Sequence, residues 1–386
     1  MKNYLFLFVV LLLFSCTQNE KPNNELNTNI SKNETLSIIK AISIPCDTLP
    51  YSFEYSSVYQ ENNELYFVGL DESTNALYFY SITNQKFSHK IQKPMEGNEK
   101  FIIKDFHIYT KDSIFLLDDR KGTIELVDNT GKQLSLVDYG KIIVPEQTGF
   151  VEADNSKRFV YSKEWNAFVM PTYPEIEFES KEFYKHRFLT LFFHKNDSVY
   201  TVGKYPSNII PNDEGFFYSS LFPVVHLMKD KFILNFSNNH FLFQLSPISN
   251  ELKEIVKWKS NYIDEDFERL PMKYEFQEAV NYNSVNGYYT NLSLDIETET
   301  LYRIVKHPQP LKNAEGKLNQ YLECGFSIMY GKLNDPNPKE VLLEKGKYVP
   351  YVVHSIGNNQ LLISLENSFN PNNKENRLEF EIIELK

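Results

Sequence analysis

Short runs of Ile, Val, Leu, Phe and Tyr recur along this chain, separated by turns that carry Asn, Asp, Gly and Lys. Runs of this kind at close and regular spacing are typical of strands in an all-β domain. We divide them into groups of four over residues 53–92, 101–138, 158–204, 222–257 and 289–344. A sixth group, residues 351–385, offers only three strands. The pattern therefore predicts repeated four-stranded sheets, the last of which lacks one strand.

One further strand, Leu36–Ile44, precedes the first group. If this strand completes the sixth sheet, the chain forms a six-bladed β-propeller of four-stranded antiparallel blades, with its two ends in one blade. Closing the ring in this way removes the exposed strand edges that would otherwise pair with other chains. The sequence thus predicts an all-β fold, with residues 36–386 forming a single propeller domain.

The longest connections between the predicted strands all fall where they would emerge from the same face of the ring. In an antiparallel blade, the connection from the second strand to the third lies on the same face as the connection to the next blade. The long segments occupy these two kinds of position only: residues 139–157, 173–186, 205–221, 258–288, 307–324 and 367–376. Long irregular loops often carry function, so this face is the predicted working face. The alternative is that the loops cap the channel and help packing.

The first sixteen residues predict the compartment. Lys2 precedes an apolar run over residues 4–14, which has the length of a signal-peptide core and is too short for a comfortable membrane span. The run ends in Leu13-Phe14-Ser15-Cys16, which resembles the bacterial lipoprotein lipobox, whose cysteine is lipidated and becomes the new N-terminus. We therefore expect a signal peptide over residues 1–15 and membrane attachment through lipid on Cys16.

The residues that follow Cys16 refine this expectation. Residues 17–33 are polar and rich in Asn, and we interpret residues 16–35 as a lipidated flexible tether. Thr17, rather than Asp, follows the cysteine, which favours the outer membrane of a bacterial cell envelope. The net charge of the full chain is −11, which argues against a nucleic-acid partner.

Three parts of the chain together resemble a known group of proteins. These are the lipobox LLLFSC, the Asn-rich tether, and the aromatic strand pattern of NELYFVGLDESTNALYFYSI, DSIFLLDDRKGTIELVDNTGK and RLEFEIIEL. The combination resembles the six-bladed β-propeller lipoproteins of unknown function from Bacteroidota, with a diffuse TolB-like or NHL-like pattern. The resemblance covers nearly the whole mature chain and implies a fold and an envelope location. It implies no reaction, because propellers host many unrelated functions.

Three histidines fall within strands that should line the central channel: His107, His226 and His354. Imidazoles that face a channel could act as a general base or bind a metal, although a single histidine there is more often a hydrogen-bonded structural residue. The chain contains no CxxC, HExxH, GxSxG or phosphate-loop motif, so we expect no metal site and no cofactor. The carboxylate pair of a glycosidase cannot be selected from sequence, because its separation is a three-dimensional property.

Tyrosines are frequent in the long connections and form a second set of candidates. A tyrosine offers a rigid apolar face and a polar tip, which suit sugar stacking or protein contacts, but the same residues could simply pack the loops onto the propeller. The candidates for ligand binding are Tyr173, Tyr184, Tyr218, Tyr262 and Tyr288.

The leading functional hypothesis is a non-catalytic envelope module that binds a protein or a glycan through the face with the long loops. The alternative is a hydrolase or lyase whose site lies at the channel mouth on that face.

Two cysteines besides Cys16 remain, Cys46 and Cys324, and nothing in their positions shows that they meet. Buried free thiols are therefore favoured over a disulfide.

Overall fold

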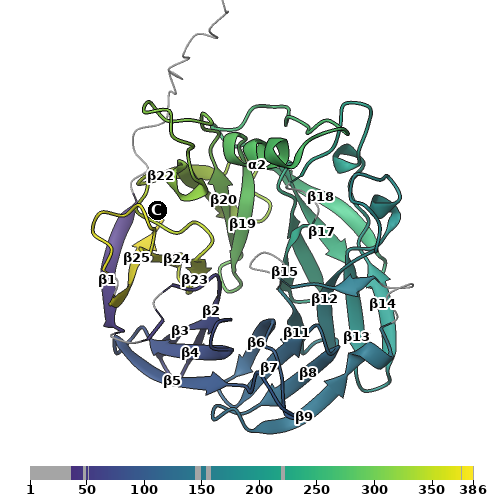
Figure 1. Ribbon diagram of the computed structural model, residues 1–386, viewed down its shortest axis with the longest axis vertical. Coiled ribbons are helices and arrows are strands. Elements are labelled where there is room, and N and C mark those ends of the chain that lie inside the picture. Colours follow the sequence, from purple (N-terminus) through teal and green to yellow (C-terminus); the bar gives the residue numbers. More distant parts are fainter. Residues whose placement is uncertain are drawn as a thin grey trace, which may run out of the picture. The chain divides into compact units, whose positions relative to one another are not determined.

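The computed structural model describes residues 36–46, 49–50, 52–143, 149–153, 158–218, 222–374 and 376–385. Within them the chain forms six antiparallel sheets arranged as the blades of a β-propeller (Figure 1). The predicted fold is therefore confirmed. The expected signal peptide, Cys16 and the tether lie outside the described residues. No helix in the described ranges is both long and apolar enough to span a membrane.

The first three blades, each ordered from the channel outward, have the following strands. They are β2 (Tyr55–Glu61), β3 (Glu64–Asp71), β4 (Ala76–Ser81) and β5 (Lys86–Gln92); β6 (Asp105–Thr110), β7 (Ser113–Asp118), β8 (Thr123–Val127) and β9 (Gln133–Asp138); and β10 (Phe150–Val151) with β11 (Val160–Ser162), then β12 (Ala167–Tyr173), β13 (Leu189–Phe193) and β14 (Ser198–Val202).

The other three blades follow the same order. They are β15 (Val224–Met228), β16 (Lys231–Asn235), β17 (Phe241–Ser246) and β18 (Glu251–Lys257); β19 (Tyr288–Asp295), β20 (Thr300–Lys306), β21 (Phe326–Lys332) and β22 (Lys339–Leu343); and β23 (Val353–Ser355), β24 (Gln360–Ser364), β25 (Arg377–Glu384) and β1 (Ser37–Pro45).

The ring closes where β1 pairs with β25, as the leftover N-terminal strand predicted. The antiparallel register runs from Ser37 opposite Glu384 to Pro45 opposite Arg377. Figure 1 shows the two strands side by side, from opposite ends of the chain. Ile42 and Ile44 are buried in a cluster with aromatic residues of the first blade, so β1 also helps to join the last blade to the first.

The core is divided among the junctions between neighbouring blades. Six hydrophobic clusters each combine side chains from two adjacent blades. The middle strands are therefore covered on both faces, and all six residues of β4 are buried. This arrangement explains why the middle strands appear in the sequence as continuous apolar runs rather than as an alternation of apolar and polar residues.

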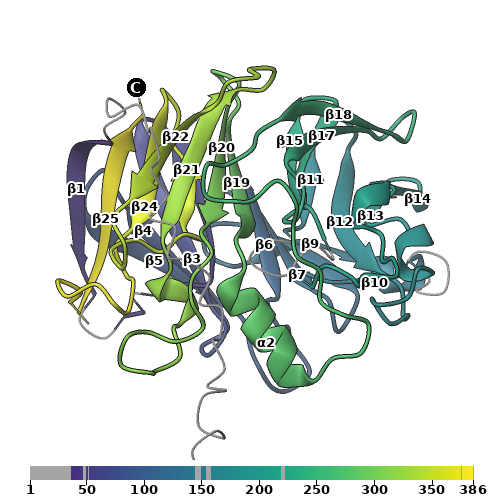
Figure 2. The ribbon, with the colours of Figure 1, turned by 90° about the horizontal axis from the view of Figure 1, so that it is seen from above.

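Tight turns join each innermost strand to the second strand, and two of them use paired asparagines. Asn62 and Asn63 both have positive φ, 51° and 63°, and so do Asn358 and Asn359, at 55° and 58°. Two consecutive residues of this kind are the signature of a type I′ hairpin turn, and Asn tolerates the left-handed region better than most residues. The long connections emerge on the opposite face, where Figure 2 shows α2 (Phe276–Val285) protruding between β18 and β19.

Two details differ from the sequence-based expectation. The innermost strand of the third blade is split into β10 and β11, which both pair with β12. The sequence pattern instead indicates a single innermost strand, over residues 158–161 at the start of the third group. Residues 264–280 have the most helix-like pattern of the sequence, but α2 begins only at Phe276. Pro271 prevents an earlier helix, and the Glu278 carboxylate caps the backbone N–H of Glu275 at 2.7 Å.

Ring closure makes a testable contribution to stability. Replacing the fully buried Ile44 with alanine should lower the free energy of unfolding by about 3 kcal/mol, because it leaves a cavity between the last blade and the first. The matched control is Ile39→Ala on the same strand, where the side chain is 48% exposed and the loss should be below about 0.5 kcal/mol. Urea unfolding measures both; equal losses would contradict the closure role of the buried face.

A buried carboxyl in the closing blade predicts a pH effect. One oxygen of Glu366 accepts the backbone N–H of Glu379 at 2.7 Å, while Oε2 is buried without a partner among the described residues. Burial raises the pKa of this group from its ordinary value near 4.5 to about 8. Between these values the folded protein holds a proton that the unfolded chain has released, so stability falls as pH rises across this interval and levels off above it.

The variant Glu366→Gln should remove this dependence, because it has no proton to lose. At pH 8 it should be more stable than the unmodified protein by roughly 1–3 kcal/mol, and at pH 4.5 the two should be similar. Urea unfolding at a series of pH values measures the difference. A stability difference that does not change with pH would show that Glu366 is not the titrating group.

Candidate functional site

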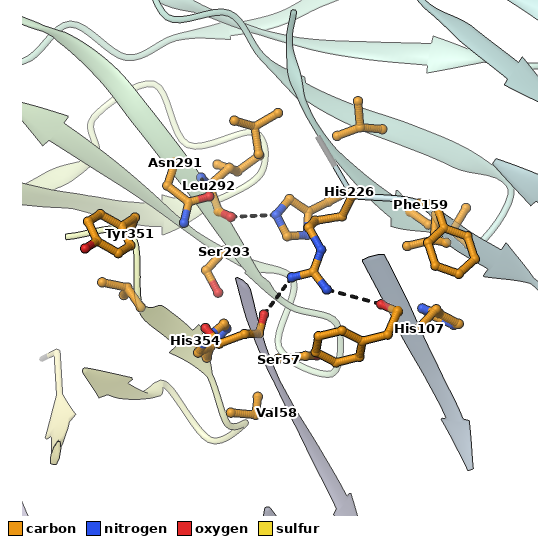
Figure 3. Close-up of a pocket in the computed structure, with 18 of the residues that line it drawn as sticks. Ser57, Val58, His107, Phe159, His226, Asn291, Leu292, Ser293, Tyr351 and His354 are labelled. Atoms are coloured by element: carbon orange, nitrogen blue, oxygen red, sulfur yellow. Dashed lines mark hydrogen bonds between the residues drawn. The ribbon is translucent and has the colours of Figure 1, made fainter. Parts of the chain in front are cut away.

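The centre of the ring contains a cavity of about 420 Å³. Residues on or beside the innermost strands of all six blades line it. Three of them are the histidines singled out from the sequence, and Figure 3 shows His107, His226 and His354 approaching the cavity from different strands. The structure therefore brings together side chains that are up to 247 residues apart, from His107 to His354.

His226 has a fixed orientation. Its Nε2 lies 2.5 Å from the backbone carbonyl oxygen of Leu292 on β19, the innermost strand of the next blade. A carbonyl oxygen can only accept, so Nε2 must carry the hydrogen, and in the neutral ring Nδ1 is left as an acceptor. Burial lowers the pKa of His226 below its ordinary value. The neutral imidazole is therefore the stable form near pH 7.

His354 and His107 are also held neutral. His354 Nε2 lies 2.9 Å from the Ser56 hydroxyl, a contact that crosses from the last blade to the first. Burial first, and then the positive charge of Arg158, lowers the pKa of His354 to about 3 and that of His107 to about 4. A cation next to an imidazole disfavours a second positive charge there, so Arg158 and the histidines form a coupled group.

Arg158 is the residue that sequence reasoning missed. Its Nε donates to Asp105 Oδ1 at 2.6 Å, Nη1 to the Ser56 carbonyl at 2.7 Å and Nη2 to the Phe106 carbonyl at 3.1 Å. Its guanidinium also lies 4.9 Å from the centre of the Phe106 ring. These contacts join the third blade to the first and second. Its position in the sequence could have identified it. Arg158 lies at the start of a predicted innermost strand, where a charged side chain is expected to face the channel.

Asp105 fixes the position of the Arg158 guanidinium. It is fully buried, and its two oxygens accept the backbone N–H groups of Phe106 and Phe159, each at 2.7 Å, in addition to Arg158. Burial raises the pKa of Asp105, and the adjacent guanidinium opposes that shift. The carboxylate therefore orients Arg158 rather than facing the cavity.

Apart from Arg158 and the histidines, the polar side chains that line the cavity are uncharged, with the exception of Glu54. Ser57, Asn291, Ser293 and Tyr351 contribute hydroxyl and amide groups, and Glu54 is exposed. Among the residues that the structure describes, no three His, Cys, Asp or Glu side chains are placed to hold a metal ion together. The geometry thus offers directed hydrogen bonds and one guanidinium within a partly enclosed space.

The tyrosine candidates of the long loops do not share this cavity. Tyr184 is buried and its ring lies 5.0 Å from that of Tyr205, while Tyr173 packs between Phe150 and Phe222. Tyr218 packs against Phe178 at 5.8 Å. The other two rings are also engaged.

Tyr262 stacks on the His307 ring at 3.8 Å, and Lys306 Nζ lies 5.2 Å from the centre of the Tyr288 ring. Each of the five candidates thus has a packing partner. Those that are half-buried still present part of their surface, but they do so at separate positions on the loops.

A buried Ser, His and Glu combination superficially resembles a hydrolase triad. His307 Nε2 lies 2.9 Å from the Ser327 hydroxyl, and that hydroxyl donates to Glu340 Oε1 at 2.6 Å. The serine proton is therefore directed to the carboxylate, and the histidine donates to the serine oxygen. A catalytic triad needs the reverse, with the histidine accepting the serine proton. Ser327 is also fully buried, so this network is structural.

A second hollow, of about 570 Å³, lies among the long loops. Its lining comes from the connection before β15, the β16–β17 connection and the segment after β18. It combines amide side chains such as Asn208 and Asn212, the rings of Phe217 and Phe267, and charges of both signs.

Cys46 and Cys324, which were considered as a disulfide pair, are both buried free thiols in the structure.

The comparisons with known proteins support the fold. No family model matches the chain, and no curated protein matches it. Among solved structures, a member of the DUF4221 family from Bacteroides vulgatus has a TM-score of 0.76 at 14% identity, covering 92% of this chain and 98% of its own. A candidate exported protein from Bacteroides fragilis has a TM-score of 0.56 at 9% identity, covering 90% and 95%. At these identities the likeness shows the six-bladed fold alone.

Proposed function

We propose that this protein is a lipid-anchored binding module of the bacterial cell envelope that holds a small polar ligand in its central channel. The observation that carries the proposal is the convergence of polar side chains, on or beside the innermost strands of all six blades, on one cavity of about 420 Å³. This volume is in the range of small-molecule sites, which typically measure about 300–1,000 Å³.

Hydrogen bonds fix the orientation of the polar side chains that line the cavity. The bond from His226 to Leu292, the contact of His354 with Ser56, and the three donor bonds of Arg158 hold these side chains in place without a ligand. Each contact joins different blades, so the cavity is organised by the closed ring. A preorganised site loses little conformational entropy when a ligand binds, which favours affinity.

A second candidate function is the docking of a protein or a glycan on the face that carries the long loops. The observation behind it is the hollow of about 570 Å³, where amide side chains lie beside aromatic rings. The five tyrosine candidates give this version less support, because each already packs against another side chain. We therefore favour the channel as the principal site.

The channel also favours an enzymatic alternative, a hydrolase or lyase. Nδ1 of neutral His226 could accept a proton, and Arg158 could stabilise developing negative charge. A catalyst would convert the channel ligand, whereas a binding module would release it unchanged. Mass analysis of the ligand before and after incubation with the protein distinguishes the two.

The proposed anchoring rests on the Leu13–Cys16 sequence and is consistent with similarity to a candidate exported protein. Replacing Cys16 with serine should abolish labelling by radioactive palmitate and move the protein from the membrane fraction to the soluble fraction. The Cys46→Ser variant is the matched control and should keep both properties. Labelling that survives in the Cys16 variant would refute the proposed anchor.

The proposed channel site can be tested by filling it. Ser57 lines the cavity on β2, and Ser57→Trp should occupy much of its volume. The control is Val280→Trp on α2, where the native side chain is 41% exposed and does not line the cavity. Protein purified from its own envelope should release a small molecule on denaturation, detected by mass spectrometry. The amount should fall at least about tenfold in Ser57→Trp and stay unchanged in the control.

The opposite result is equally clear. Equal recovery of the released molecule from Ser57→Trp and from the unmodified protein would show that the ligand is not held in the channel. Circular dichroism should confirm that both variants remain folded.

A further inference from the structure

The lining of the channel holds more basic than acidic side chains. Arg158 and three histidines face the cavity, against a single lining carboxylate among the described residues, Glu54, which is exposed. The chain as a whole carries a net charge of −11, so this local excess of basic groups runs against the composition of the protein. An excess of basic groups in a partly enclosed space favours a negatively charged ligand.

Arg158 has donors to spare for such a ligand. A guanidinium has five N–H groups, and the structure assigns three of them: Nε–H to Asp105, one Nη1–H to Ser56 and one Nη2–H to Phe106. Among the residues that the structure describes, no acceptor is assigned to the second N–H of either terminal nitrogen. Two N–H groups on neighbouring nitrogens match the two oxygens of a carboxylate or of one side of a phosphate.

Asp105 does not block this interaction. It is fully buried, and both of its oxygens accept hydrogen bonds from the protein, whereas the Arg158 side chain is 22% exposed. A ligand in the cavity therefore reaches the guanidinium and not the carboxylate. The ion pair fixes the direction of the guanidinium, so Asp105 serves as a positioning residue for Arg158.

The histidines can adjust to an anion. They are neutral near pH 7, first because they are buried and second because the charge of Arg158 lowers the pKa of His107 and of His354. A bound anion would offset that charge and favour protonation of the nearby rings. A protonated ring donates from both nitrogens, so His226 could keep its bond to Leu292 and still donate from Nδ1.

We propose that the channel ligand carries a carboxylate or phosphate group, bound by the two remaining N–H groups of Arg158 and flanked by the three histidines. This proposal rests on the proposed function, since it specifies the chemical class of the ligand in the same cavity. Binding should tighten as pH falls from 8 to 6, because protons enter the site together with the anion.

The pH dependence can be assigned because few other groups face the site. The first blade contributes Glu54, the second His107 with Asp105 behind it, and the third Arg158. The fourth contributes His226, the fifth only the uncharged Asn291 and Ser293, and the sixth Tyr351 and His354. The histidines are the groups in this set whose protonation adds a positive charge between pH 8 and 6. A carboxylate ligand stays charged over this range, whereas a phosphate takes up a proton itself, so the pH dependence is measured with a carboxylate.

The test uses three probes: succinate, inorganic phosphate and succinamide. Succinamide has nearly the shape of succinate but no charge. Binding to the folded domain is measured by isothermal titration calorimetry, and carbon-13-labelled histidine reports contact with the channel through its ring NMR signals. We expect one of the two anions to bind and shift these signals, and succinamide to bind at least about tenfold more weakly. The preferred anion identifies whether the natural group is a carboxylate or a phosphate.

A charge placed in the cavity provides the matched variants. Ser57→Asp adds a carboxylate to the lining without touching the bonds of Arg158, and should weaken the preferred anion at least about tenfold. Val280→Asp adds the same charge on α2, outside the cavity, and should leave the affinity unchanged within about twofold. Thermal melting confirms that both variants fold.

Three outcomes would overturn the proposal. They are equal binding of succinate and succinamide, no binding of either anion, and an anion affinity that is the same in Ser57→Asp as in Val280→Asp. These failures concern only the charge of the ligand. If Ser57→Trp still releases less of the natural ligand, the channel site stands and its ligand is uncharged; if it does not, the proposed function itself is wrong.

Discussion

The pairing of β1 with β25 is the interaction on which the rest of this structure depends. It joins residues from the two ends of the chain, Ser37–Pro45 and Arg377–Glu384, in one blade. Because β1 is the outermost strand of that blade, the pairing closes the ring at its periphery, away from the innermost strand β23. Ile42 and Ile44 then extend the core from the last blade into the first. Closure thus provides both backbone pairing and apolar burial.

The channel site is a product of this closure. The contact of His354 with Ser56 crosses the junction between the last and first blades, and the bonds of Arg158 tie the first three blades together. The bond from His226 to Leu292 crosses from the fourth blade to the fifth. Each blade supplies a polar group, but no single blade could orient it. The stability of the ring and the geometry of the site are therefore linked.

Most of the fold could be predicted from the sequence, because each blade is formed by the same local pattern of apolar strands and tight turns. The recurring strand runs, a last group that lacks one strand and a leftover strand at the N-terminus leave few alternatives to a closed ring. The same reasoning placed His107, His226 and His354 on innermost strands, and the structure places all three in the channel. It could not predict the fixed tautomer of His226, because that depends on a carbonyl 66 residues away.

Other features were hidden for similar reasons. No sequence pattern singles out Asp105, and its role follows only from its burial against Arg158. The split into β10 and β11 reflects an interruption of the innermost strand that runs of apolar residues do not reveal. The tyrosines of the long loops stay candidates for ligand binding. Composition could not show that each ring also has a packing partner, as Tyr262 has in His307.

A crystal structure of the protein purified from its own envelope, with no ligand added, would show directly whether the channel beside Arg158 holds an acidic ligand. We expect ordered density in the channel, with two oxygen atoms within hydrogen-bonding distance of the terminal nitrogens of Arg158. A channel that holds only water, with an ordered ligand bound instead in the hollow among the long loops, would contradict it.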